Sequence, residues 1–142
     1  MYVAVSSPRP GVVELVELDS DLAETARASV SEAELPAFVA GREPAHPRWV
    51  WADTRRWYPG LLAAGARVER CVDLRMCRLI LRNAVAARHT ELARAPRDRW
   101  DAPRAAAPAS HDVLFELEEP EPDDDPVAEL RRQRAAIAES TA

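Results

Sequence analysis

The chain has 142 residues, enough for about one domain, since domains typically run to ~100–150 residues. The formal net charge of −5 hides a basic middle, because residues 1–47 carry −5, residues 48–104 carry +7 and residues 105–142 carry −7. No segment approaches the ~20 consecutive apolar residues of a membrane helix, the first residues do not resemble a signal peptide, and two cysteines exclude a disulfide-rich scaffold. All 19 basic residues are arginine and 27 residues are alanine, a bias typical of GC-rich genomes, so we expect a bacterial, cytoplasmic protein without a membrane partner.

Two apolar, β-branched segments open the chain at residues 2–5 and 12–18, and the Pro/Gly-containing turn between them predicts a hairpin. The second segment does not alternate cleanly, which indicates a bulge or burial on both faces. Residues 19–40 predict helix in part, with one start capped by Ser20 or Asp21 and a second start at residues 31–35. Residues 41–47, with two prolines, predict a loop.

The middle of the chain predicts strand, helix, strand, helix. Residues 48–53 combine tryptophan and valine as a strand does, and they end in a helix-capping Asp53. Pro59 suits a first helical turn, so the following helix is expected to start near Tyr58 and to end before Gly65. Residues 67–72 predict a short strand, and residues 73–88 predict a helix capped by Asp73. This order predicts an α/β fold with both strands in one sheet.

The last third divides by composition. We expect a domain over residues 1–95, a Pro/Ala loop over 96–111 and a strand over 112–117. An acidic linker over 118–126 then leads into an amphipathic helix that starts at 127 and is still running at 142.

Carboxylates are the first candidates for chemistry, because the sequence has no zinc-type Cys or His pair, no nucleophile elbow and no glycine-rich phosphate loop. Two-metal nucleases need several carboxylates converging on cations about 4 Å apart. The candidate contributors are Glu17, Asp19, Asp53 and Asp73. The alternative is that Asp53 and Asp73 are helix N-caps.

Arginines and tryptophans supply the candidate binding surfaces. Arg75, Arg78 and Arg82 recur at helical spacing opposite the apolar face expected for residues 74, 77 and 81, with Arg55 and Arg56 nearby in sequence. Such a stripe could contact DNA phosphates, or it could be a solvated face or pair with the acidic arms. Trp49, Trp51 and Trp57 predict a core cluster, with a protein-docking face as the alternative.

The tryptophan-rich block from Pro47 to Arg82 resembles the N-terminal region of actinobacterial family-A DNA polymerases, usually named bifunctional 3′–5′ exonuclease/DNA polymerase. Residues 114–117, the acidic linker and residues 126–133 resemble that family's passage into its polymerase part. The resemblance implies a partial RNase H-like exonuclease fold, with a mixed sheet flanked by helices.

An active proofreading domain of this kind has an Asp-x-Glu pair on its first strand, an Asn-x-x-x-Asp motif and a third Asp after a Tyr, which together hold two divalent metals. Here the second motif falls on residues 53–57, with Asp53 in the Asn position and Trp57 in place of the metal-binding Asp. The first motif falls near residues 15–17 and keeps only Glu17, and no third motif is found. The resemblance therefore implies a degenerate exonuclease-like domain with no metal of its own, in which Asp73 is a scaffold residue.

We therefore expect a non-catalytic, structural segment of a DNA-directed DNA polymerase, a nucleotidyltransferase of DNA replication or repair. In the parent protein the expected partners are DNA and the polymerase domain. The Mg²⁺ would belong to that polymerase domain, which these residues do not contain.

Two alternatives stay open. One is a stand-alone interaction module that docks through its tryptophan face or its C-terminal helix. The other is a residual metal-dependent 3′–5′ exonuclease that uses Glu17, Asp53 and Asp73.

Overall fold

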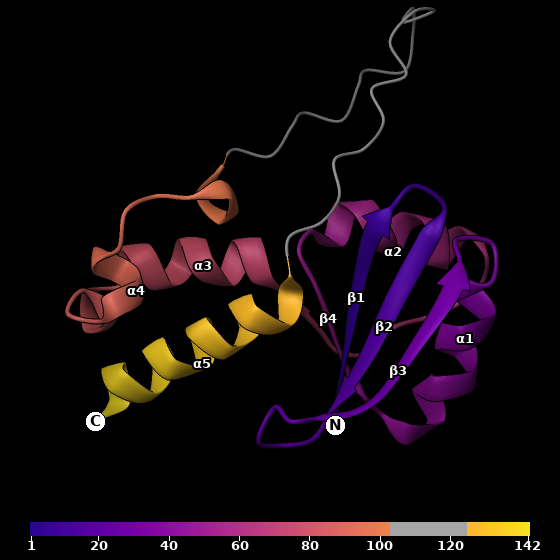
Figure 1. Cartoon of the computed structure of the whole chain (residues 1–142), viewed down its shortest axis with the longest axis horizontal. Coiled ribbons are helices and arrows are strands. Elements are labelled where there is room, and N and C mark those ends of the chain that lie inside the picture. Colours follow the sequence, from indigo (N-terminus) through magenta and orange to yellow (C-terminus); the bar gives the residue numbers. More distant parts are fainter. Residues whose placement is uncertain (103–124) are drawn as a thin grey trace, which may run out of the picture.

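The computed structural model describes residues 1–102 and 125–142 (Figure 1). The strands are β1 (Tyr2–Arg9), β2 (Val12–Leu18), β3 (Glu24–Ser31), β4 (Arg48–Trp51) and β5 (Cys71–Asp73). The α-helices are α1 (Leu35–Arg42), α2 (Thr54–Ala63), α3 (Leu74–Asn83), α4 (Glu91–Arg94) and α5 (Pro126–Thr141). Three 3-10 turns are η1 (Glu43–Ala45), η2 (Val85–Ala87) and η3 (Arg99–Asp101).

The strands form one mixed sheet in the order β3-β2-β1-β4-β5. β1, β2 and β3 make an antiparallel meander, which includes the predicted hairpin, and β4 and β5 add to β1 in parallel. Parallel neighbours end at the same edge of a sheet, so Asp53, just after β4, and Asp73, at the end of β5, lie close together. The expected α/β fold with both later strands in one sheet is confirmed.

Helices cover both faces of this sheet (Figure 1). Because side chains alternate along a strand, Trp49 and Trp51 face one side and Val50 faces the other. The tryptophan side packs against α1 and α2, and the Val50 side packs against Leu74 of α3 and Leu130 of α5. The predicted burial of both faces of β2 is confirmed, since Leu15 belongs to the first cluster and Leu18 to the second.

The predicted helix over part of residues 19–40 is wrong in its first half. Residues 24–31 form β3, which pairs along the whole length of β2. The Ala/Glu-rich composition has little strand preference of its own, and non-local pairing with β2 overrides it. The second predicted start is close to correct, because Ser31 and Glu34 hydrogen-bond reciprocally just before α1 begins at Leu35.

The remaining boundaries differ in detail. α2 begins at Thr54, not near Tyr58, because Asp53 caps it there and Pro59 lies inside the helix. Gly65 follows the helix with a φ of +79°, as expected of a residue at that position. The strand predicted over 67–72 shortens to β5, and the helix predicted over 73–88 ends at Asn83, where the chain turns extended at Ala84.

The C-terminal helix exists as predicted, but it does not lead away from the domain. α5 packs on α3 and on the sheet, with Val127 and Leu130 in the second core cluster together with Trp100 of η3. Residues on both sides of the predicted boundary at residue 95 thus share this core cluster. The strand predicted over 112–117, most of the 96–111 loop and most of the 118–126 linker lie outside the described residues. None of the helices in the described ranges has the length and apolarity needed to cross a membrane.

Candidate functional site

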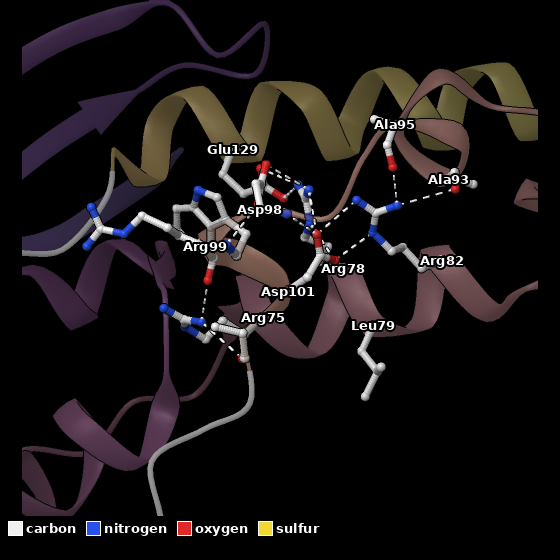
Figure 2. Close-up of polar contacts among 12 residues, drawn as sticks. Arg75, Arg78, Leu79, Arg82, Ala93, Ala95, Asp98, Arg99, Asp101 and Glu129 are labelled. Atoms are coloured by element: carbon white, nitrogen blue, oxygen red, sulfur yellow. Dashed lines mark hydrogen bonds and ion pairs between the residues drawn. The ribbon is translucent and has the colours of Figure 1, made fainter.

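Two arginines of the α3 stripe, Arg78 and Arg82, face inward onto carboxylates of η3 and α5 (Figure 2). Arg78 is only 2% exposed, so the alternative of a solvated face does not hold for it. Its Nη1 atom donates to both carboxylate oxygens of Glu129, at 2.9 and 3.0 Å, and its Nε and Nη2 atoms each donate to Asp101, at 3.1 Å. Asp98 adds a further ion pair at 3.0 Å. A guanidinium offers five donors in a fixed plane, so one side chain can bind several carboxylates at once.

The cluster extends along α3 to Arg82, which also binds Asp101. A second set of its donors reaches the carbonyl oxygens of Ala93 and Ala95, at 3.3 and 2.8 Å. On the other side, Gln133 donates to Glu129 and to the Leu74 carbonyl, both at 2.8 Å. The buried charges are thus paired and hydrogen-bonded, as burial of an ion requires.

The pKa values in this cluster are set by competition between burial and pairing. Burial by itself would raise the pKa of Asp101, but the hydrogen bonds from Arg78 and Arg82 hold that pKa far below its usual range. Burial would lower the pKa of Arg78, and its bonds to Asp101 and Glu129 raise it instead. Arg78 and Asp101 are therefore both charged at neutral pH, and the cluster joins α3, η3 and α5.

Asp53 and Asp73 meet at the carboxyl ends of β4 and β5, and both act as helix caps. Asp53 accepts from the Arg55 backbone N–H at 2.8 Å. Asp73 accepts from the Met76 N–H of its own helix at 3.0 Å and from the Thr54 N–H of α2 at 2.8 Å. The capping interpretation of both residues is confirmed, and Asp73 ties together the starts of two helices.

Glu17 lies at the other end of the sheet from these two carboxylates. Its register partner on β1 is Val3, which pairs with Trp49, and Asp53 lies four residues further along. At ~3.3 Å per residue this offset is about 13 Å along the strands alone, too far for a shared pair of metals about 4 Å apart. Glu17 instead pairs with Arg42 at 2.8 Å. The structure therefore does not bring Glu17, Asp53 and Asp73 together.

The residues assigned to the exonuclease motifs do not form a metal site. Glu17 lies on the second strand, whereas the motif belongs on the first, and β1 carries no carboxylate. Trp57, in the second motif, is a buried core residue of α2. Across residues 1–102 and 125–142 there is no group of three His, Cys, Asp or Glu side chains placed to hold a metal ion.

The five arginines proposed to contact DNA have different environments. Arg78 and Arg82 are bound inside the cluster, so they do not form an exposed basic stripe. Arg75 donates to the Arg99 carbonyl at 3.0 Å and lies over the ring of Trp100. Arg55 is exposed at the start of α2, and Arg56 stacks on Trp57 with its guanidinium 4.6 Å from the ring centroid.

The alternative that the arginines pair with the acidic arms holds for Glu129, whereas sequence reasoning missed Asp98 and Asp101 as their partners. The sequence did contain a warning: apolar residues surround α3 except along the arginine stripe, so hydropathy alone does not fix which side is buried.

No protein-family model, curated protein or solved structure matches the chain. Its fold and site define an α/β protein with a mixed sheet, capped helix starts and a buried arginine–carboxylate cluster.

Proposed function

We propose that the chain is a non-catalytic, RNase H-like segment of a family-A DNA polymerase of the bifunctional exonuclease/polymerase type. In this proposal DNA synthesis and its Mg²⁺ belong to the polymerase domain of a longer, cytoplasmic parent chain. This segment supports that domain and lies near the DNA.

One observation supports the non-catalytic assignment: the residue at the metal-binding position of the second motif and the two nearby carboxylates all serve the scaffold. Asp53 and Asp73 cap helices, and Trp57 is a core residue. The mixed sheet with helices on both faces also agrees with the architecture that the resemblance over residues 47–82 implies.

The gene itself provides the sharpest test of the parentage. We expect the reading frame to continue beyond codon 142 into polymerase sequence. A stop codon directly after codon 142 in the genomic locus would overturn the assignment to a polymerase.

Catalysis is tested separately with a 5′-labelled single-stranded oligonucleotide and Mg²⁺ or Mn²⁺. The expected result is intact substrate. Shortening of the oligonucleotide that disappears in Asp53→Ala and Asp73→Ala would instead establish the residual exonuclease, which the distance of Glu17 from these residues does not support.

DNA contact is proposed for Arg55 and Arg56, because Arg78 and Arg82 are engaged inside the fold and Arg75 donates to the Arg99 carbonyl. Duplex binding by fluorescence anisotropy should weaken with salt, and Arg55→Ala should reduce the salt slope by about 0.9 per lost phosphate contact. Arg88→Ala, an exposed arginine in another element, is the charge-matched control. Equal binding by both variants would remove Arg55 from the interface.

Two observations make the alternative interaction module less favoured than the polymerase segment. Trp49, Trp51 and Trp57 are buried under α1 and α2, and the apolar side of α5 is buried against the sheet.

A further inference from the structure

α3 turns an apolar face toward solvent because its arginine face is buried. Met76, Leu79 and Ile80 are 48%, 56% and 58% exposed. With Asn83 they occupy positions i, i+3, i+4 and i+7, so they form one continuous stripe, the outer face of α3. Figure 2 shows Leu79 pointing away from the buried charges. A continuous exposed apolar stripe, unlike a single exposed leucine, is typical of an interaction site.

A hollow of about 210 Å³ lies beside this stripe, and Met76 and Leu79 form part of its wall. Trp100 and Ala102 of the η3 segment also line it. The outer face of α3 therefore combines a ridge with an adjoining depression, into which a side chain of a partner can insert.

The border of the hollow is basic. Arg75 and exposed Arg97 line it, and α3 itself contains no acidic residue. Asp101 also contributes to the lining, but it is nearly buried and bound to Arg78 and Arg82, so its charge is compensated. A partner with carboxylates beside its apolar residues would complement this border.

We propose that the outer face of α3 binds an acidic amphipathic helix of a partner protein. The apolar residues of that helix would recur at i, i+3, i+4 and i+7 and pack on Met76, Leu79 and Ile80, with its carboxylates near Arg75 and Arg97. This inference does not depend on the proposed polymerase parentage.

Two other occupants fit less well. A second copy of the chain would bring two basic borders together, which repel. Nucleic acid would meet aliphatic side chains, which cannot stack on bases as aromatic rings do, and Arg82 is already engaged.

The test uses the full chain and a labelled synthetic peptide of about three helical turns, with leucines at i, i+3, i+4 and i+7 and glutamates at the flanking positions. A scrambled peptide of the same composition is its control. We expect the helical peptide to bind and the scrambled peptide to bind far more weakly in fluorescence anisotropy.

A matched pair of variants locates the binding. Leu79→Glu should lower affinity about tenfold or more. Leu62 of α2 is 50% exposed, close to the exposure of Leu79, and Leu62→Glu should bind the peptide as the wild type does. Arg97→Glu should weaken binding and flatten its salt dependence, and Arg9→Glu, at the end of β1, should do neither. Circular dichroism checks that each variant is folded, and Leu79→Ser replaces Leu79→Glu if the latter unfolds.

Three results would overturn the proposal. The first is equal binding of the helical peptide by the Leu79→Glu and Leu62→Glu variants, or no binding by the wild type. The second is a dimer in sedimentation that Leu79→Glu alone dissociates, which would identify a second copy as the occupant. The third is duplex DNA binding that Leu79→Glu abolishes and Leu62→Glu leaves intact.

Discussion

The Nη1 atom of Arg78 in α3 lies 2.9 and 3.0 Å from the two carboxylate oxygens of Glu129 in α5, a residue 51 positions away in sequence. Both side chains are buried. Together with Val127 and Leu130 in the second core cluster, this contact joins the C-terminal helix to the rest of the fold, since buried charges must be paired.

Removing the carboxylate should therefore be costly. Glu129→Ala leaves a buried guanidinium short of one partner, and we expect it to lower the free energy of unfolding by about 3–5 kcal/mol, measured by urea denaturation. Arg132→Ala removes a contact to the same carboxylate from a side chain that is 51% exposed, and it should cost about 0–1 kcal/mol. Similar losses in the two variants would mean that the buried contact is not what stabilises α5.

Acid should weaken the fold through Asp101. The pKa of Asp101 in the folded protein lies far below the ~3.9 of an aspartate in an unfolded chain, because burial is outweighed by the bonds from Arg78 and Arg82. Its contribution to stability is thus complete above about pH 4 and is lost as the pH falls below that, since the unfolded chain takes up the proton first. Urea denaturation between pH 7 and pH 2 should show this decline. Asp101→Asn should be less stable at pH 7 and less sensitive to acid, while exposed Asp21→Asn should keep the wild-type slope.

The three buried tryptophans of the first core cluster should respond differently to replacement by phenylalanine. Trp49 Nε1 donates to Glu43 at 2.8 Å and Trp51 Nε1 donates to Thr54 at 2.9 Å. The Nε1 of Trp57 is buried and has no hydrogen-bond partner among the described residues. Trp57→Phe removes an unsatisfied donor, so it should cost about 1–3 kcal/mol less than Trp49→Phe or Trp51→Phe. Thermal unfolding followed by circular dichroism measures this, and three equal losses would contradict it.

Asp73 should matter more for stability than Asp53. Asp73→Ala removes caps from the starts of both α2 and α3 and should cost about 2 kcal/mol, against about 1 kcal/mol for Asp53→Ala. Urea denaturation compares the two variants directly. A larger loss in Asp53→Ala would show that Asp73 does not bridge the two helices.

Local patterns in the sequence predicted the hairpin, β4, both helix caps and the existence of α2, α3 and α5. They failed for β3, whose pairing with β2 is a non-local interaction that composition does not reveal. They also failed to predict which face of α3 is buried. The carboxylate partners of Arg78 and Arg82 lie 19 to 51 residues further along the chain, so no window around the helix contains them.

The RNase H-like interpretation and the DNA contacts remain predictions. From the sequence, the candidate metal site could be judged only by which carboxylates its motifs retain, because the distances between them depend on the strand register. The structure argues against residual exonuclease activity, because Glu17 and Asp53 lie at opposite ends of the sheet.

The buried arginine of α3 also restricts how this protein can evolve. A homologue that loses the carboxylate at position 129 should also change at position 78, because the buried guanidinium there would be short of one of its partners. Asp101 binds both Arg78 and Arg82, so its loss should be accompanied by changes at those positions. We therefore expect homologous sequences to covary at positions 78, 82, 101 and 129, while the surface arginines vary independently.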